Sequence, residues 1–252
     1  MKIKYCIPSY GRANNQKTLN YIKNAKVYIC KEQYDEYIKN NPKYIDNFVI
    51  CPDGIQGNKE GTGKVLTMNW ILDNEMDDDS IIVFLDDDIK CLKRHKNIDG
   101  KIKGEEIDFE EFEEIIKEYS LLAKEWNIGA WGFNNSNDPL LYYEYEPFSL
   151  HKLLCGIIVI VKKDDIRFDK RVSTKEDVDF CLQHWKKYHK TLRVNKYYPD
   201  TKAFKGEGGL QVFRNKEKNI NDMKELMKKW GTDVVRKKGI QEVKTILPFG
   251  GV

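Results

Sequence analysis

Apolar and polar positions along the first ninety residues follow two periods, which predict strands and helices in turn. Short apolar stretches that end at turn-forming residues predict strands at residues 2–10, 26–31, 47–54 and 80–88. Apolar residues at helical spacing predict helices between them, at residues 14–24, 32–41 and 64–74. Strands that alternate with helices are typical of βαβ units, so the sequence predicts an α/β fold with a mostly parallel sheet flanked by helices.

The pattern continues beyond residue 100 without a repeat or a linker. It predicts an acidic helix at residues 109–126, a strand at residues 153–161, and a loop that becomes a helix within residues 168–190. A basic C-terminal stretch follows. We therefore expect a single domain over residues 1–252, with a basic C-terminal extension packed against it.

The predicted strand at residues 80–88 leads an apolar run into three successive aspartates. A continuous apolar run is typical of a buried central strand, and ligands of open α/β sheets bind beyond the carboxyl ends of such strands. Side chains alternate along an extended chain, so Asp86 and Asp88 can converge while Asp87 points away. Their mutual repulsion is tolerable beside a cation. This pattern predicts a site for Mn²⁺ or Mg²⁺ formed by Asp86 and Asp88.

Charge is unevenly distributed, although the net charge is only +3. Residues 104–146 hold 12 acidic and 2 basic residues, which we interpret as a solvated helix face. Residues 184–244 hold 17 basic and 7 acidic residues. An excess of positive charge favours an anionic partner, which could be a nucleotide, a nucleic acid or a phosphorylated glycan.

The six cysteines and the first residues indicate the compartment. No two cysteines form a CxxC pair and several lie in apolar runs, as expected of reduced core thiols. The N-terminus lacks the apolar region of a signal peptide, and no apolar run reaches the ~20 residues of a membrane-spanning helix. We expect a cytoplasmic protein without a membrane partner.

Four motifs together resemble those of GT-A fold glycosyltransferases. They are "IPSYGR" at residues 7–12, "CPDG" at residues 51–54, "FLDDDI" at residues 84–89 and "IRFDKRVSTKEDVDF" at residues 166–180. The resemblance implies a GT-A, Rossmann-like domain. Residues 1–100 would then form the half that binds a nucleotide-sugar, and residues 101–252 the half that binds the acceptor, together with the basic extension.

The same resemblance implies a set of donor-site residues. The third motif looks like the DxD element, whose last aspartate holds the metal and whose first faces the nucleotide-sugar. Lys64 is also a phosphate candidate on physical grounds, because it opens a helix after glycines. The residues expected to bind the nucleotide-sugar, which we expect to be UDP-linked, are Pro8, Ser9, Tyr10, Arg12, Asp53, Lys64, Asn69, Asp86 and Asp87.

On the acceptor side, the motif at residues 166–180 contains three acids. One carboxylate must take the proton of the acceptor hydroxyl, and burial beside another acid would tune its pKa. By the family pattern we place this base at Asp177, with Glu176 as a neighbour that contacts the acceptor and Asp179 in a structural role. The acids also fit a helix N-terminus, where negative charge is favoured.

Within the family, "QKTLNYI", "GTGKVLTMNWIL" and "FLDDDI" look like the TET-associated glycosyltransferases of bacteriophages. This resemblance implies 5-hydroxymethylpyrimidines such as 5-hydroxymethylcytosine in double-stranded phage DNA as the acceptor, and the host cytoplasm as the location. Lys202, Phe204 and Lys205 would contact an extruded base and its backbone. A glycan or protein acceptor, or a non-catalytic nucleotide- or nucleic-acid-binding module, stays open as an alternative.

Overall fold

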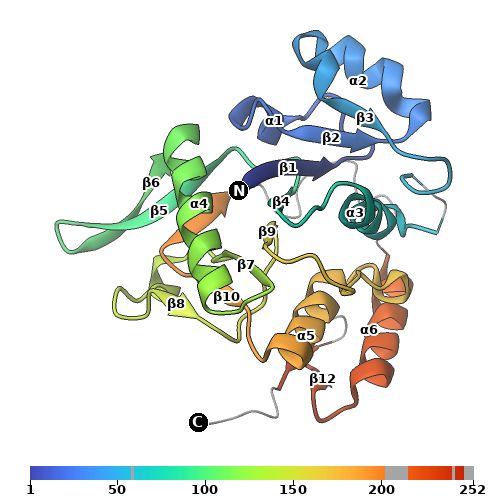
Figure 1. Ribbon diagram of the computed structural model, residues 1–252. Helices are drawn as coiled ribbons and strands as arrows, with labels where there is room; N and C mark the ends of the chain where they lie inside the picture. Colours follow the sequence, from blue (N-terminus) through green and yellow to red (C-terminus); the bar gives the residue numbers. More distant parts are fainter. Residues whose placement is uncertain (58–59, 202–214, 240–241, 247–252) are drawn as a thin grey trace.

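The computed structural model describes residues 1–57, 60–201, 215–239 and 242–246 (Figure 1). Within these residues, an eight-stranded sheet has the order β3-β2-β1-β4-β9-β7-β10-β8. Its strands are β1 (Lys2–Pro8), β2 (Lys26–Ile29), β3 (Phe48–Ile50), β4 (Ser80–Leu85), β7 (Ala130–Phe133), β8 (Phe148–Ser149), β9 (Ile157–Ile160) and β10 (Leu192–Val194).

The large sheet is mostly parallel, as predicted. Strands β3, β2, β1 and β4 run parallel to one another, and β10 runs parallel to β7. Strand β9 lies antiparallel between β4 and β7, and β8 is antiparallel to β10. The pairing of β4 with β9 therefore joins strands from both halves of the chain in one sheet, and the α/β fold class is confirmed.

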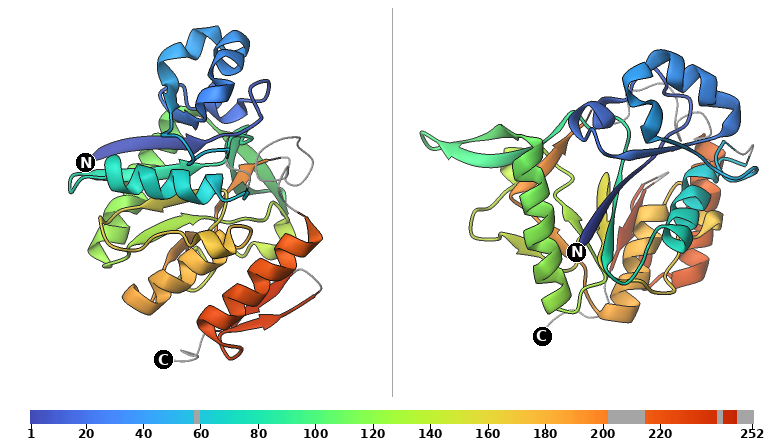
Figure 2. Two further views of the ribbon diagram at one scale, coloured as in Figure 1. Left: turned by 90° about the vertical axis from the view of Figure 1, so that its right-hand side faces the viewer. Right: turned by 45° about the horizontal axis from the view of Figure 1, so that its top comes forward.

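Helices cover both faces of this sheet. In Figure 2, α4 lies on one face, and α3, α5 and α6 lie on the other. The α-helices are α1 (Lys17–Tyr21), α2 (Tyr34–Asn40), α3 (Gly63–Asn74), α4 (Phe109–Glu125), α5 (Glu176–Tyr188) and α6 (Lys216–Trp230). Short 3-10 helices occupy Lys31–Gln33, Pro42–Asn47, Pro139–Leu141 and Lys170–Val172.

Strand β4 shows why two covered faces demand a continuous apolar run. Ile81 and Val83 enter the core beneath α4, whereas Ile82 and Phe84 enter the core beneath α3 and α5. All six residues of the strand are buried. Burying such a side chain contributes about 1.5–3 kcal/mol. The strand is therefore fixed firmly, and it delivers the three aspartates at its end to a defined place.

A β-hairpin that the apolar pattern did not predict projects from the body of the molecule (Figures 1 and 2). Strands β5 (Cys91–Ile98) and β6 (Lys101–Ile107) pair antiparallel, and β5 also pairs antiparallel with β11 (Tyr197–Asp200). Asp99 and Gly100 form its two-residue turn with φ of 53° and 76°, as an Asp-Gly type I′ turn requires. Apart from Ile98 and Ile102, its outer positions are polar, so no regular apolar alternation marks it.

The C-terminal part packs onto the body, as expected. Asn215 begins α6 by accepting a hydrogen bond from the Lys218 backbone N–H at 2.8 Å, and Gly231 ends the helix with φ of 81°. Strands β12 (Val235–Lys237) and β13 (Val243–Thr245) follow. Among the described residues, no helix is both long and apolar enough to span a membrane.

Candidate active site

Parallel strands β1 and β4 are neighbours, so their carboxyl ends bring two predicted motifs together. Asp87 points into the protein, where the Ser9 hydroxyl donates a hydrogen bond to it at 2.6 Å and Arg12 forms an ion pair with it. Only 4% of Asp87 is exposed. Burial raises the pKa of Asp87 to about 6, against the lowering effects of Arg12 and Ser9. This middle aspartate thus ties β4 to the loop after β1.

Thr18, for which the sequence pattern indicates no role, fixes the backbone of the aspartates. Its hydroxyl donates to the carbonyl oxygen of Asp86 at 2.6 Å and accepts from the N–H of Ile89 at 2.9 Å. Thr18 is fully buried at the start of α1. In the sequence, Thr18 is a polar residue directly before an apolar helix face. A residue that only caps a helix gives the same pattern, so the pattern does not reveal the contact with the aspartates.

Lys64 joins the strand that ends in aspartates to the helix that begins with acids. Its Nζ lies 3.1 Å from Asp86 Oδ1 and 3.2 Å from Glu176 Oε1. Burial lowers the pKa of Lys64, but the charges of Asp86 and Glu176 outweigh this effect and raise the pKa well above its ordinary value. Lys64 therefore stays charged, in the first turn of α3, where the helix dipole also favours anions.

Asp177 lies next to this bridge, in the first turn of α5. Burial, and then the charge of Glu176, raise the pKa of Asp177 to about 6, whereas Lys64 and Lys175 act to lower it. The Val178 N–H donates to Asp177 Oδ1 at 2.8 Å. A carboxylate with a pKa near 6 is matched to proton transfer near neutral pH.

Cys155 lies between the two groups of acids. Burial raises the pKa of its thiol well above the ordinary value, and the charges of Asp177 and Asp86 raise it further. The thiol is therefore neutral. Next to it, the carbonyl oxygen of Gly156 accepts a hydrogen bond from the Asp86 N–H at 3.0 Å. The segment before β9 therefore lies between the end of β4 and the start of α5.

Asp86 and Asp88 are the two acids predicted to hold a divalent cation. Both side chains are partly exposed, and burial followed by the charge of Asp86 raises the pKa of Asp88. The two carboxylates therefore repel each other, which a cation with oxygen ligands would relieve. Arg12, 3.6 Å from Asp88, supplies part of this compensation.

Two comparisons with known proteins bear on this arrangement. The family model described as TET-Associated Glycosyltransferase matches residues 3–209. The chain belongs to the TET-associated glycosyltransferase family. This membership, predicted from the motifs, is confirmed and places the chain among glycosyltransferases. No curated protein matches it. The crystal structure of S. aureus TarS 1–349 is similar over 90% of this chain and 66% of its own, less than two thirds, with 14% identity and a TM-score of 0.46.

The other donor-site residues predicted for this glycosyltransferase lie around the same edge of the sheet. Pro8 ends β1, and the ring of Tyr10 lies so close to Gly57 that a Cβ there would be 2.5 Å from it. Asp53 is exposed in the turn after β3. Asn69 exchanges two hydrogen bonds of 2.8 Å with the backbone of Phe168. Asn69 thus holds α3 to the segment before α5, and its donor role stays a prediction.

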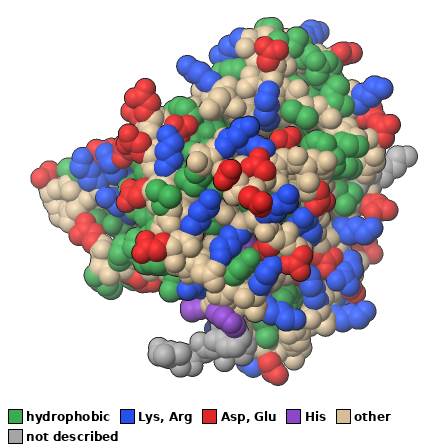
Figure 3. Space-filling view, in the orientation of Figure 1, with side chains coloured by type: hydrophobic (Ala, Val, Ile, Leu, Met, Phe, Trp, Pro, Cys, Tyr) green, Lys and Arg blue, Asp and Glu red, His purple; other side chains and the backbone are tan. Residues whose placement is uncertain are grey.

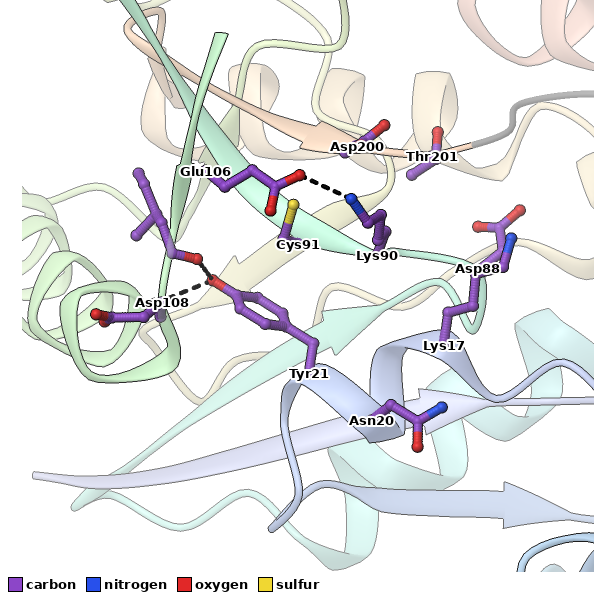
Figure 4. A pocket seen from close by; sticks show the side chains of 11 residues that line it. Lys17, Asn20, Tyr21, Asp88, Lys90, Cys91, Glu106, Asp108, Asp200 and Thr201 are labelled. Carbon is purple, nitrogen blue, oxygen red and sulfur yellow. Dashed lines mark hydrogen bonds and ion pairs between the residues drawn. The ribbon is translucent and has the colours of Figure 1, made fainter.

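A cavity of about 890 Å³ lies on the other side of Asp88, at the root of the hairpin (Figure 4). Figure 4 shows Lys17 and Tyr21 on α1 facing Lys90 and Glu106 on the hairpin side. Cys91, Glu106 and Asp200 could together hold a metal ion, but Lys90 lies 2.7 Å from Glu106 and Lys93 lies 2.8 Å from Asp200. These acids are already compensated. The predicted acceptor residues Lys202, Phe204 and Lys205 lie outside the described residues.

Proposed function

We propose that the protein transfers a sugar from a nucleoside-diphosphate donor, UDP-linked, to a hydroxyl group of a 5-hydroxymethylpyrimidine in double-stranded DNA. The observation that carries the proposal is the bridge of Lys64 between Asp86 and Glu176. Through this bridge, the single side chain of Lys64 contacts both the predicted donor element at the end of β4 and the predicted acceptor element at the start of α5.

The donor diphosphate would lie against Lys64 and the first turn of α3. A charged lysine at a helix N-terminus stabilises an anion through both its charge and the helix dipole. Asp86 and Asp88 would hold Mn²⁺ or Mg²⁺, which would neutralise charge on the diphosphate. Ser9, Tyr10 and Asp53 stand on the same edge of the sheet and would surround the nucleoside.

The transfer step uses the carboxylate of Asp177. The acceptor oxygen forms a bond to the anomeric carbon while the bond from that carbon to the diphosphate oxygen breaks. The hydroxyl proton passes to Asp177, and the diphosphate leaves with the bonding electron pair. A base with a pKa of about 6 is deprotonated at neutral pH and can accept this proton. Glu176 keeps Lys64 beside the reacting centre.

The hairpin supports DNA as the acceptor. Lys96 lies opposite Lys103 on the neighbouring strand, and Lys101 is the first residue after the turn. All three lysines are exposed. Glu105 compensates Lys96 at 2.6 Å. The exposed charges of Lys101 and Lys103 would attract a phosphate backbone. The face in Figure 3 also carries many Lys and Arg side chains over α5 and α6, interspersed with acids.

The test compares UDP release and sugar transfer for two aspartate variants. Asp88→Ala should abolish Mn²⁺-stimulated UDP release from a UDP-sugar, whereas Asp79→Ala, in an exposed acidic turn, should leave it unchanged. Equal effects of the two substitutions would contradict the proposed site.

Transfer assays on duplexes with and without 5-hydroxymethylcytosine test the acceptor. Incorporation of sugar into the modified duplex alone is the expected result. Transfer to a glycan or a peptide instead would replace the DNA acceptor but keep the enzyme class. Binding of UDP without any release or transfer would favour the non-catalytic alternative.

A further inference from the structure

Helix α6 packs against the segment that leads into α5. This segment, residues 169–175, contains the short helix Lys170–Val172 and runs directly into Glu176 and Asp177. Figure 1 shows α6 beside α5, and Figure 2 shows both on the same face of the sheet. The predicted catalytic acids therefore begin a helix whose approach is lined by the C-terminal part of the chain.

The first contact is made by Asp222, in the middle of α6. Its carboxylate accepts a hydrogen bond from the backbone N–H of Thr174 at 2.8 Å, and only 5% of the residue is exposed. Lys218, one turn earlier, lies 3.8 Å from it. Hydrogen bonds from a backbone N–H to a buried carboxylate are among the stronger ones in proteins. This bond fixes the backbone two residues before Glu176.

The second contact lies at the end of α6, where two residues hold Asp179. Asp179 is completely buried in the first turn of α5. The Nζ of Lys229 lies 2.8 Å from Asp179, and the indole N–H of Trp230 donates to Asp179 at 2.7 Å. Lys229 also lies 2.9 Å from Asp169. Lys229 therefore contacts one residue that precedes Glu176 and Asp177 in the sequence, Asp169, and one that follows them, Asp179.

We propose that α6 is a positioning element for the catalytic carboxylates: Asp222, Lys229 and Trp230 hold the first turn of α5 so that Glu176 meets Lys64 and Asp177 faces the acceptor. The inference rests on the proposed function. Residues 216–230 lie beyond the stretch matched by the family model, residues 3–209. The site is thus completed by a helix outside the family-defining segment.

The physical reason is that a buried carboxylate keeps its place only while its partners are present. Gln183 also donates a hydrogen bond to Asp179, at 2.7 Å. Removing Lys229 takes away the cation that compensates this buried carboxylate, and Asp179 would then move toward water. Asp179 lies two residues from Asp177 in the same helical turn, so this movement displaces the base. A misplacement of about 1 Å can lower a rate by about 10²-fold.

The test uses Lys229→Met, with Lys228→Met as the matched control and Lys229→Arg as the conservative variant. Lys228 is the exposed neighbouring residue of the same helix. Lys229→Met should lower kcat for transfer by about 10²-fold with little change in KM for the UDP-sugar. Lys229→Arg should restore most of kcat, because it keeps a cation beside Asp179. Lys228→Met should behave as the wild type.

A second readout does not depend on turnover. The carboxyl ¹³C signal of Asp177 should titrate near pH 6 in the wild type and at lower pH in Lys229→Met, because the displaced side chain becomes hydrated. If Lys229→Met does not fold, Trp230→Phe, which removes only the indole hydrogen bond, serves in the same two measurements.

The outcomes separate this inference from the proposed function. An active wild type with a defective Asp177→Asn variant, but with Lys229→Met equal to Lys228→Met in kcat and in the titration, overturns the positioning role. A wild type without UDP release overturns the proposed function, and the Asp177 titration then still decides whether α6 sets the position of the acid.

Discussion

Neighbouring acids of this chain have different environments because backbone geometry separates them. Strand β4 ends at Leu85, and in the turn that follows Asp87 points inward to Ser9 and Arg12, while Asp86 reaches Lys64. In the first turn of α5, Asp179 is buried against α6 while Asp177 stays partly exposed. The turn after β4 and the rotation along the first turn of α5 thus give neighbouring carboxylates different partners.

Asp177→Asn should lower the rate of sugar transfer by roughly 10²–10⁴-fold, the usual contribution of general-base catalysis. Donor affinity should stay nearly unchanged, because the direct neighbours of the proposed diphosphate position are Lys64 and Asp86. Single-turnover transfer and calorimetry with UDP measure the two quantities. Asp165→Asn, at an exposed acid near the far end of α5, is the control. Abolished UDP binding with an intact transfer rate would show that Asp177 is not the base.

Glu176→Gln should move the acidic limb of the pH–rate profile to lower pH. The negative charge of Glu176 raises the pKa of Asp177, so a neutral glutamine lets Asp177 lose its proton more readily. The wild-type limb is expected near pH 6, and the measurement is kcat between pH 4 and 8. An unchanged or higher midpoint would contradict the coupling between these two residues.

At the scale of elements, the hairpin β5–β6 and helix α6 extend the sheet domain on its two sides. The hairpin begins three residues after Asp88, so its root borders the cavity beside the site, and its turn carries exposed lysines. Helix α6 has apolar residues such as Leu226 against the core and exposed lysines such as Lys224 and Lys228 on its outer side. Each of the two elements packs against the body of the molecule on one side and exposes charged side chains on the other.

Replacing Lys96, Lys101 and Lys103 together by Gln should weaken duplex binding and flatten its salt dependence. Each lysine that no longer neutralises a phosphate reduces the slope of log K against log[salt] by about 0.9. Replacing the exposed Lys23, Lys39 and Lys43 by Gln gives a control of equal charge change on the lobe of α1 and α2. The measurement is a salt titration of binding to a fluorescent duplex. Equal slopes for the two triple variants would exclude the hairpin as the DNA-binding surface.

At the scale of the whole molecule, the candidate site lowers the stability of the fold. The pKa of Asp177 is about 6 in the folded state and 3.8 ordinarily, so the folded state holds this proton more tightly than the unfolded chain. Between about pH 4 and pH 6 the contribution of this residue to stability therefore falls as the pH rises, and above pH 6 the full cost is present. Burial of the ionised Asp177 carboxylate thus opposes folding above about pH 6.

Asp177→Asn should consequently raise the temperature of thermal unfolding, and by more at pH 8 than at pH 4. Asn carries no charge at either pH, so the variant avoids a cost that the wild type bears only after Asp177 ionises. Unfolding followed by circular dichroism at both pH values measures the difference. A stabilisation that is the same at the two pH values would indicate that Asp177 is not held in a desolvating environment.

The sequence by itself determined five strands of the large sheet, β1 to β4 and β9, the helices α1 to α5, and the family. The run of apolar residues in β4 required burial on both faces, and the alternation of strand and helix required a mostly parallel sheet. These are local properties, since the period of the apolar positions sets the element and its covered faces. The motifs around Asp86 and Asp177 carried the membership that the family model confirms.

Only the tertiary structure decided which side chains meet. Lys64, Asp86 and Glu176 are far apart in the chain, and their contact depends on the end of β4 and the starts of α3 and α5 lying at the same edge of the sheet. The support from Thr18 and from Lys229 depends on packing in the same way. The hairpin also escaped prediction, because its outer positions, apart from Ile98 and Ile102, are polar and lack the apolar alternation that burial imposes. Contacts between distant residues follow from how elements pack, and no local pattern encodes that packing.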